Sequence, residues 1–531
     1  MTLSCRIKGH IQPFERVLAL EELKVLSEGS IHPLNGDEAT ATLFSVSGRT
    51  SAGLLRDSLA YWHAVGDQDK DLTSQLRFEA TSVVARNGLA IHDMPARVRE
   101  LVPQKIPSKR TLRYATHGLH EYRGKFFPQL VRSLINIARV PTDGILVDPM
   151  CGSGTTLVEG RISGRASFGL DMNPLSAFIS KVKCKTLEFA PTALIAAYDK
   201  LHQALTTGTS QAKWGHSDSL PAKDQAYLER WFSPVVLGEL DRIHGAIGTL
   251  DRLDIREFFL LSLSNIIRRV SWQKTDDLRV RREIKEFEQG EVTAEFLGEI
   301  LASTKLVVGF LVERGSSQLG NFDVRESDAR NASRQFPDLV GRVDAIITSP
   351  PYATALPYLD TDRLSLIYLG LLPRDKHRGL DTRMIGNREI SEAIRQRYLA
   401  AYESGGGSLP SQTRELVDRV AQLNESSNVG FRRRNMAALL SKYFFDMKAV
   451  LEQSHSMLRP NGTMFLVVGN NQTTAGGELV EIQTAGHLQA IATEVGFKAL
   501  PPIGMEMLAS RDIFRRNAMP SEQIVRLTKG Q

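Results

Sequence analysis

Cysteine is scarce in this chain of 531 residues, and its three cysteines, Cys5, Cys151 and Cys184, lie far apart in the sequence. None of them belongs to a CxxC pair or to a Cys/His spacing of the kind that holds structural zinc. The sequence therefore predicts neither a disulfide framework nor a metal centre. A reducing environment such as the cytoplasm is expected instead.

Long apolar runs and an excess of one charge are also missing. The longest apolar run, Phe258–Ile267, is about half of the roughly 20 residues that a membrane-spanning helix needs. The opening segment MTLSCRIKGHIQPFERV lacks the apolar core of a signal peptide, so a cytoplasmic protein without a membrane partner is predicted. The 66 Lys and Arg residues against 60 Asp and Glu give a net charge of +6, which permits nucleic-acid binding without requiring it.

The length predicts two to four structural units, at about 150 residues each. The first 105 residues carry no assignable motif, whereas strand-like and helix-like stretches alternate from about residue 106, which predicts a parallel α/β sheet. The predicted regions are an accessory module at 1–105, a cofactor-binding part of the sheet at 106–190, a helical insertion at 191–318, a catalytic part at 319–370, a polar insertion at 371–440 and a last part of the sheet at 441–531.

A glycine turn, DPMCGSGTTLVEG, follows the first strand predicted in the sheet. A dinucleotide-binding turn needs a third glycine where Leu157 stands, and a phosphate-binding P-loop needs a lysine that this stretch lacks. Both phosphate-binding interpretations therefore fail. What remains is a tight turn at Gly152 and Gly154 that lets a ligand approach the backbone, or else a packing turn that starts a helix.

Two more acidic residues follow the next predicted strands. Asp171 ends the second strand, about 20 residues after the glycine turn, where a carboxylate can accept hydrogen bonds from two ribose hydroxyls. Asp328 follows the third predicted strand, where it could reach an adenine amino group or lie in a solvated turn. The carboxylate of Asp148 in the turn suits a positively charged ligand. S-adenosylmethionine (SAM) has both a ribose and a positive charge. SAM is therefore the predicted cofactor.

A rigid corner, TSPPY, ends the strand predicted at 343–347. Pro350 and Pro351 lack a backbone N–H and fix their own φ, so the strand cannot continue through them. Ser349 precedes the two prolines and Tyr352 follows them, which places a hydroxyl and an aromatic ring on the corner. Taken alone, the tetrapeptide is more typical of a structural end to a buried strand.

Taken together, the two motifs resemble those of the amino-methylating DNA methyltransferases, which use SAM to modify an exocyclic nitrogen of cytosine or adenine. That family's first motif, Asp-Pro-Phe-x-Gly-Ser-Gly-Thr-Thr, is matched at 148–156 except for Met150 in place of Phe. Its catalytic motif, [Asp/Asn/Ser]-Pro-Pro-[Tyr/Phe], is matched at 349–352. The resemblance covers roughly 110–190, 320–370 and 440–500. It implies a Rossmann-like class I SAM-dependent methyltransferase sheet.

The resemblance also implies site residues, because HEYRGKFFPQL is similar to the segment that closes over the methionine end of SAM, and GLDMNPLS to the second-strand motif. The implied cofactor-binding residues are Tyr122, Lys125, Phe126, Asp148, Pro149, Cys151, Gly152, Ser153, Gly154, Thr155, Thr156, Asp171, Asn173, Asp328 and Ala329. The implied catalytic residues are Ser349, Pro350, Pro351 and Tyr352. Tyr352 can stack on a base that has been extracted from the duplex.

Basic residues gather in both insertions. The stretches IIRRVSWQKTDDLRVRREIK and FRRRN combine cations with an aromatic or amide side chain, which suits contact with phosphates and base edges. For the first stretch the alternative is a solvated helix face with Trp272 in the core, and for the second it is a solvated charged surface. The candidate DNA-binding residues are Arg268, Arg269, Trp272, Lys274, Arg279, Arg281, Arg282, Arg432, Arg433 and Arg434.

The leading hypothesis is therefore a site-specific DNA methyltransferase that acts on double-stranded DNA. Within the family, serine at the position of Ser349 favours cytosine N4, although adenine N6 stays open. Methylation of cytosine carbon-5 is disfavoured because the chain contains no Pro-Cys dipeptide. A restriction-modification or phage-defence system, with its own partner proteins, is the expected context. The alternatives are an RNA or protein amino-methyltransferase and a catalytically silent DNA-binding subunit.

Overall fold

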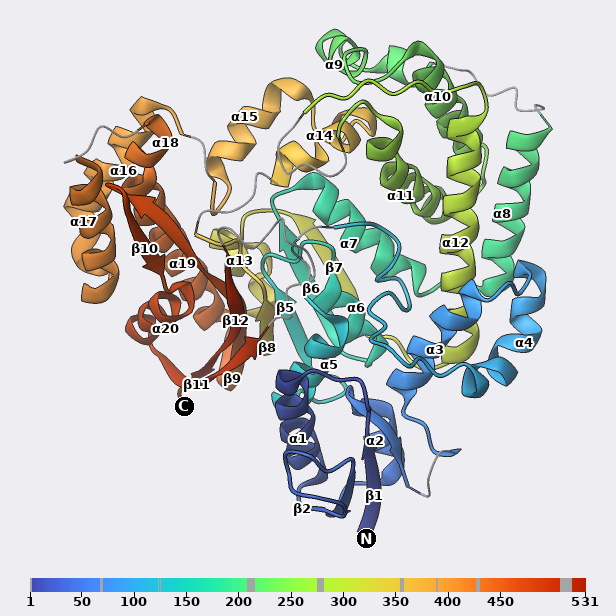
Figure 1. Cartoon of the computed structure of the whole chain (residues 1–531), viewed down its shortest axis with the longest axis horizontal. Helices are drawn as coiled ribbons and strands as arrows, with labels where there is room; N and C mark the ends of the chain where they lie inside the picture. The colour runs from blue at the N-terminus through green and yellow to red at the C-terminus, as the bar shows by residue number, and fades with distance from the viewer. Residues whose placement is uncertain are drawn as a thin grey trace.

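The computed structural model describes residues 2–66, 70–122, 124, 126–207, 215–274, 281–353, 358–387, 390–425, 430–506 and 518–531. Within these residues the chain forms a small N-terminal sheet and a larger central sheet, with helices around both (Figure 1). The central sheet carries the predicted motifs at one end of its strands, so its topology decides where a ligand can bind.

The small sheet is antiparallel, in the order β2-β3-β1-β4. Side chains of β1 alternate between buried positions and exposed or partly exposed ones, as expected for a strand with one face on a core. Its buried face joins one hydrophobic cluster with α1 and with α5 of the central sheet, through residues such as Leu18 and Leu134. The elements are β1 (Thr2–Ile7), α1 (Pro13–Ser27), β2 (Ser30–Pro33), β3 (Leu43–Ser47), α2 (Ala52–Ser58), β4 (Trp62–Val65) and α5 (Pro128–Ile137).

The central sheet has the order β11-β12-β9-β8-β5-β6-β7 within the described residues, and β10 pairs with β9 outside that path. The five strands from β9 to β7 are parallel. At the other edge, β12 is antiparallel to β9, and β11 is antiparallel to β12. The strands are β5 (Ile145–Asp148), β6 (Ala166–Asp171), β7 (Phe322–Glu326), β8 (Val343–Thr348), β9 (Leu458–Ala475), β10 (Glu478–Ile482), β11 (Phe497–Glu506) and β12 (Ala518–Lys529).

This strand order confirms the predicted Rossmann-like SAM-dependent methyltransferase sheet. From β5 the chain moves to β6 and β7 on one side, and it returns to β8 on the other side. The direction of winding therefore reverses between β5 and β8. In such sheets, ligands bind beyond the carboxyl ends of the strands at the reversal point.

Both faces of the parallel strands are covered, which explains their continuous apolar sequences. In β8, Ala345 and Ile347 belong to the cluster that contains α5, whereas Ile346 belongs to the cluster on the opposite face. The second cluster is built largely on α19 (Met436–Met457) and α20 (Thr484–Val495). The strands thus pack between two hydrophobic layers, one on each face of the sheet, and this packing fixes the relative positions of their carboxyl ends.

Long helices occupy much of the region predicted as a helical insertion. They pack on α3 and α4 of the first 105 residues, where Phe78 and Phe310 meet edge to face at 5.0 Å between ring centroids. The position of the domain boundary at 105 stays a prediction. The helices are α3 (Ser74–Arg86), α4 (Met94–Leu101), α8 (Pro191–Thr206), α9 (Ala222–Leu228), α10 (Pro234–Gly248), α11 (Leu253–Val270) and α12 (Glu291–Arg314).

The region predicted as a polar insertion is also helical where it is described. Its later helices, α16–α18, lie across the central sheet from α8 and α10–α12 (Figure 1), whereas α15 packs against α9. Among the described helices, none is long and apolar enough to cross a membrane. The helices that follow the proline corner are α14 (Tyr358–Tyr368), α15 (Arg374–Arg383), α16 (Glu392–Gly405), α17 (Ser411–Glu425) and α18 (Phe431–Arg434).

A buried carboxylate fixes the segment that leads to Tyr122. Glu159, on α6 (Thr155–Ile162), is fully buried and accepts hydrogen bonds from the Tyr114 hydroxyl at 2.6 Å and from His117 Nε2 at 2.8 Å. Arg132 on α5 lies 3.7 Å from the same carboxylate. A buried charge is tolerated when such partners surround it. The segment before Tyr122 is therefore attached to the helix that starts at the glycine turn.

Candidate active site

The glycine turn after β5 adopts a backbone conformation that favours glycine. Gly152 and Gly154 have φ values of +50° and +77°, in the left-handed region. A Cβ atom on Gly152 would lie 3.0 Å from Cε1 of Tyr122, whose hydroxyl is 3.1 Å from the Ser176 hydroxyl. Because no side chain stands on Gly152, the Tyr122 ring packs against the turn; the predicted closure of its segment over the methionine end of SAM stays a prediction.

Asp171 joins the end of β6 to the glycine turn. Its two carboxylate oxygens accept hydrogen bonds from the backbone N–H of Gly152 at 2.9 Å and of Asn173 at 2.8 Å. Burial raises the pKa of Asp171 to about 6, although these two N–H donors favour the charged form and oppose the rise. Each oxygen retains a second lone pair, so the carboxylate can still accept two hydrogen bonds from a ligand.

Asp148 lies beneath the turn rather than on a ligand-facing surface. It is fully buried at the end of β5, and its Oδ1 accepts a hydrogen bond from the Met150 N–H at 3.2 Å. Burial raises the pKa of Asp148 to about 7, with the nearby Thr348 and Thr156 hydroxyls opposing that rise. The geometry fits a carboxyl that shapes the turn from below.

A cavity lies at the reversal point of the sheet, where ligands bind in sheets of this kind. Twelve of its lining residues were predicted for cofactor binding or catalysis: Tyr122, Phe126, Pro149, Cys151, Gly152, Ser153, Thr155, Asp171, Asn173, Ala329, Ser349 and Pro351. Sequence reasoning missed Gly124, Met172, Ser327, Met384 and Ile385, and it noted Met150 only as a departure from the family motif.

The other predicted site residues have different positions. Asp148, Gly154, Thr156, Asp328, Pro350 and Tyr352 are not among the described residues that line the cavity. Lys125 lies outside the described residues. Although burial alone would raise the pKa of Asp328, hydrogen bonds from Arg330 and its charge hold that pKa below the usual value. The proposed roles of these residues stay predictions.

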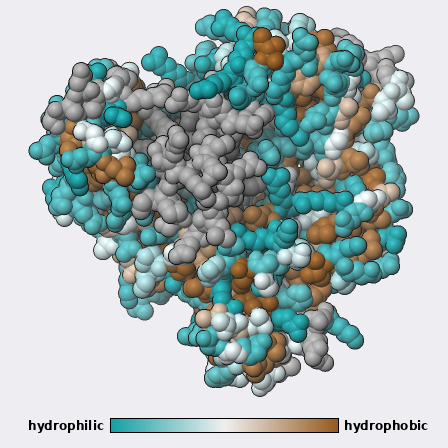
Figure 2. Space-filling view, in the orientation of Figure 1, coloured by the Kyte–Doolittle hydropathy of each residue, from teal (hydrophilic) through white to brown (hydrophobic). Residues whose placement is uncertain are grey.

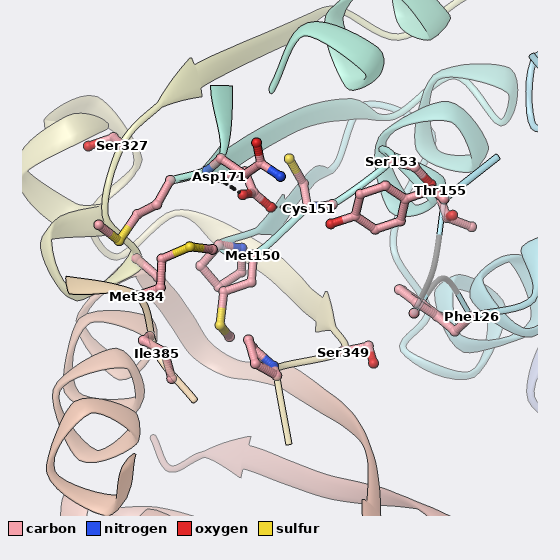
Figure 3. Close-up of a pocket in the computed structure, with 18 residues that line it drawn as sticks. Phe126, Met150, Cys151, Ser153, Thr155, Asp171, Ser327, Ser349, Met384 and Ile385 are labelled. Atoms are coloured by element: carbon pink, nitrogen blue, oxygen red, sulfur yellow. Dashed lines mark hydrogen bonds between the residues drawn. The ribbon is translucent and has the colours of Figure 1, made fainter. Parts of the chain in front are cut away.

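The lining residues are arranged along the cavity (Figure 3). Ser327, Met384 and Ile385 lie at one end, and Phe126 lies with Thr155 at the other. Asp171 stands between the two ends, and Ser349 lies nearer to Phe126 than to Met384. The carboxylate is thus central, and the catalytic corner opens on one half of the cavity.

Tyr352 is held by two strands from the far end of the sequence. Its hydroxyl donates a hydrogen bond to Oε1 of Glu522 on β12 at 2.7 Å. A Cβ atom on Gly469 of β9 would lie 3.1 Å from Cζ of the Tyr352 ring, and Gly469 is paired with Glu522 across the sheet. The absence of a side chain at Gly469 therefore makes room for the ring beside the cavity.

The residues present fit SAM. The turn at Gly152 leaves backbone accessible, the central carboxylate of Asp171 can accept from a ribose, and the thioethers of Met150 and Met384 offer an apolar wall. Among the described residues, no group of three or more His, Cys, Asp or Glu side chains could hold a metal ion.

Known methyltransferases are similar to this chain. The family described as RMKL-like, methyltransferase domain, matches residues 119–230. The Type II methyltransferase M.MvaI of Kocuria varians is 26% identical over 367 residues, covering 67% of this chain and 77% of that protein. The Type II methyltransferase M.BsoBI of Geobacillus stearothermophilus is 23% identical over 417 residues, covering 72% and 79%.

These similarities support a SAM-dependent DNA methyltransferase. SAM is therefore its cofactor, as predicted from the glycine turn and Asp171. A shorter match is the tRNA (guanine(10)-N2)-dimethyltransferase of Methanocaldococcus jannaschii, which is 38% identical over 50 residues, or 9% of this chain.

Asn173 of the methyltransferase has a structural role besides its place on the cavity wall. It caps α7 (Pro174–Thr186) by accepting a hydrogen bond from the Leu175 N–H at 3.1 Å, and its Nδ2 donates to Asp362 on α14 at 2.9 Å. Replacing it by alanine is expected to lower the free energy of unfolding by about 1 kcal/mol, whereas serine, which keeps the cap, should lower it less. Urea denaturation of both variants measures the difference. Equal losses would mean that the contact with Asp362 dominates.

The candidate DNA-binding residues of α11 lie beside the cavity segment 120–122. Asn265 accepts a hydrogen bond from the Glu121 N–H at 2.9 Å, and Arg268 and Arg269 follow one turn later on the same helix. Arg269 forms ion pairs with Glu295 at 3.1 Å and Glu299 at 2.6 Å. The helix thus carries its basic end next to the segment that covers the glycine turn.

The remaining candidates are distributed over both insertions. The indole N–H of Trp272 donates to the Lys285 carbonyl at 2.8 Å, and the Arg282 guanidinium lies 4.5 Å from the ring centroid. Lys274, Arg281, Arg282, Arg433 and Arg434 are exposed, whereas Arg279 and the side chain of Arg432 lie outside the described residues. On the face shown in Figure 2, hydrophilic residues predominate and apolar ones are scattered among them.

Proposed function

We propose that this methyltransferase transfers a methyl group to the exocyclic amino group of a flipped base in double-stranded DNA, with cytosine N4 as the target. One observation carries the proposal. The Ser349-Pro350-Pro351-Tyr352 corner ends β8 and opens on the same cavity as Asp171 and the glycine turn. SAM, when bound, supplies an electrophilic methyl group on a positively charged sulfur.

The chain's own residues must make the amine nucleophilic, because its lone pair is delocalised into the ring of the base. The Ser349 hydroxyl and the Pro350 carbonyl are acceptors for the two amine hydrogens, which favours a pyramidal nitrogen. The two prolines fix these acceptors in advance, so little ordering entropy is lost during the reaction. Tyr352 receives the extracted base by stacking.

Two further features support DNA as the substrate and a defence role. The Type II methyltransferases that resemble this chain match it over 67% and 72% of its length, which includes more than the cofactor loop. Basic candidates stand on insertions on both sides of the central sheet (Figure 1). We therefore place the protein in the cytoplasm, as the modification enzyme of a restriction or phage-defence system. Serine at position 349 supports cytosine over adenine.

RNA is the second candidate substrate. The 50-residue match to a tRNA (guanine(10)-N2)-dimethyltransferase supports it. Because cofactor-binding residues do not read the acceptor, this match is compatible with either nucleic acid.

A product assay tests the proposal. Purified protein is incubated with isotope-labelled SAM and, separately, with double-stranded DNA or RNA, and the nucleosides are then identified by mass. N4-methylcytosine from DNA is the expected product. Detection of N6-methyladenine would make adenine the target instead of cytosine. Label in RNA alone would refute the DNA proposal. SAM binding without any methylated product would indicate a catalytically silent DNA-binding subunit. A Ser349→Ala variant serves as the control for contaminating activity.

A further inference from the structure

Two apolar residues of the region predicted as a polar insertion reach the cofactor cavity. Met384 and Ile385 line it at the end where Ser327 also lies, opposite Phe126 (Figure 3). Ile385 is only 7% exposed, although it lies in a segment rich in charged residues. Neither residue belongs to the glycine turn or to the proline corner.

The backbone of this segment is held at the end of a helix. α15 ends at Arg383, and the Met384 N–H donates to the carbonyls of Leu380 and Asp381. The carbonyls of Arg383 and Met384 would otherwise lack helical partners. Arg330 Nη2 donates to the Arg383 carbonyl at 2.8 Å, and Lys442 Nζ donates to the Met384 carbonyl at 2.9 Å. Cations at a helix C-terminus are also favoured by the helix dipole.

Carboxylates on two other elements hold these cations. Arg330 binds Asp328 through Nε and Nη2, at 2.9 Å and 2.7 Å, and binds Asp446 on α19 through Nη1 at 2.5 Å. Lys442 forms an ion pair with the same Asp446. Arg330 and Lys442 are 22% and 8% exposed, so solvent screens the network only weakly. The network connects the end of β7, α19 and the end of α15.

The order of residues along the cavity indicates which part of SAM this end receives. A ribose on Asp171 would lie at the centre, and the sulfur must lie near Ser349, which is on the Phe126 side (Figure 3). The adenine therefore falls at the end of Ser327, Met384 and Ile385. A thioether and a branched aliphatic side chain suit the flat apolar face of a purine.

We propose that Met384 and Ile385 select the adenine end of the cofactor, and that Arg330 and Lys442 are positioning residues that hold these two side chains in place. This inference rests on the proposed function only for the position of Ser349 relative to the sulfur. It gives Asp328 an indirect role, because its carboxylate orients Arg330.

Binding of S-adenosylhomocysteine and of its N6-benzyl derivative, measured by calorimetry without nucleic acid, tests the selecting residues. Wild type should strongly prefer the unsubstituted compound. Met384→Ala should raise the affinity for the N6-benzyl compound relative to S-adenosylhomocysteine by about 10-fold or more, because the removed side chain leaves room for the substituent. Phe126→Ala, at the other end of the cavity, is the control and should leave that ratio unchanged.

The outcomes separate this inference from the proposed function. A gain of N6-benzyl binding cannot come from misfolding. An unchanged ratio in Met384→Ala, or a gain in Phe126→Ala instead, would overturn the assignment of the adenine end. The proposal that the protein methylates DNA would stand. If the wild-type protein bound neither compound, both the assignment of SAM as the cofactor and this inference would be overturned.

The positioning residues are tested by steady-state kinetics. Arg330→Gln and Lys442→Met should each raise the KM for SAM by about 10-fold, since each removes a charge-assisted bond, while kcat at saturating SAM stays near the wild-type value. Arg330→Lys should recover part of the loss. Arg325→Gln is the matched control, because Arg325 lies on β7, shortly before Arg330 in the chain, and pairs with Asp323 at 2.7 Å without reaching α15. A loss in kcat alone, or an equal effect of Arg325→Gln, would refute the positioning role.

Discussion

Replacing Tyr352 by alanine is expected to cut turnover by about 100-fold or more while the affinity for SAM stays within about twofold of wild type. Stacking of a base on an aromatic side chain contributes about 1–3 kcal/mol, and a displacement of about 1 Å in the reacting groups can cost a further 100-fold. The ring is absent from the cavity wall, so its loss should spare the cofactor. Single-turnover methylation at saturating SAM and calorimetric SAM binding measure the two quantities.

Two conservative variants show which property of Tyr352 matters. Tyr352→Phe keeps the ring and loses the 2.7 Å hydrogen bond to Glu522, so its loss of turnover should be smaller than that of alanine. Glu522→Gln keeps an acceptor for the hydroxyl and should retain most of the activity. An equal loss of SAM affinity and turnover in Tyr352→Ala would place this residue with the cofactor and refute its role at the base.

Asp171→Asn is expected to weaken SAM binding by about 10- to 150-fold, the equivalent of about 1.5–3 kcal/mol for hydrogen bonds to a charged group. The amide keeps the size of the carboxylate. Its NH₂ group, however, faces one of the two backbone N–H groups, of Gly152 or Asn173, that donate to the carboxylate in the wild type. One backbone N–H of the turn therefore loses its acceptor, and the ligand loses a negatively charged hydrogen-bond partner. Asp323→Asn, on an exposed part of β7, is the control and should bind SAM as wild type does.

The same carboxyl predicts a pH dependence. Its pKa is about 6 in the folded protein, raised by burial from the ordinary value of 3.8, and a ligand that donates to both oxygens binds the charged form. SAM affinity should therefore fall as pH drops through about 6, by up to tenfold per pH unit. The Asp171→Asn variant should lack this step. A wild-type affinity that does not change between pH 5 and pH 7 would show that the cofactor makes no use of the charge.

The effect of this carboxyl on stability has the opposite direction. Because its folded-state pKa is raised, the unfolded chain binds fewer protons than the folded one between pH 3.8 and about pH 6. The contribution of Asp171 to stability without cofactor is thus fully present below pH 3.8 and is lost as pH rises through about 6. SAM binding should restore stability in the upper part of this range.

Local sequence patterns were sufficient for the parts of the site that are contiguous in the chain. The glycine turn needs left-handed backbone at two positions, and the proline corner needs two residues that cannot continue a strand. Both requirements leave a mark on the sequence itself. The strand-helix alternation around them predicts the parallel sheet for the same reason.

Residues that reach the site through tertiary packing left no such mark. Ile385 is one apolar residue in a charged segment, and Glu522 lies 170 positions after its partner Tyr352. Asp328 shows a further difficulty. It follows the third strand as predicted, but Arg330, two residues later, takes its carboxylate. Sequence spacing gives the position of a carboxylate on the sheet edge, whereas its direction depends on which cation lies nearest.

The wall at Met384 and Ile385 has a consequence for the order in which ligands bind. The same stretch of backbone lines the cofactor cavity and leads on toward α16 in the region predicted to contact DNA. If binding of DNA shifts this stretch, it changes the affinity for SAM, and by reciprocity SAM must change the affinity for DNA by the same factor. Retention on DNA would then depend on the supply of methyl donor, and the demethylated cofactor left after each turnover would govern release.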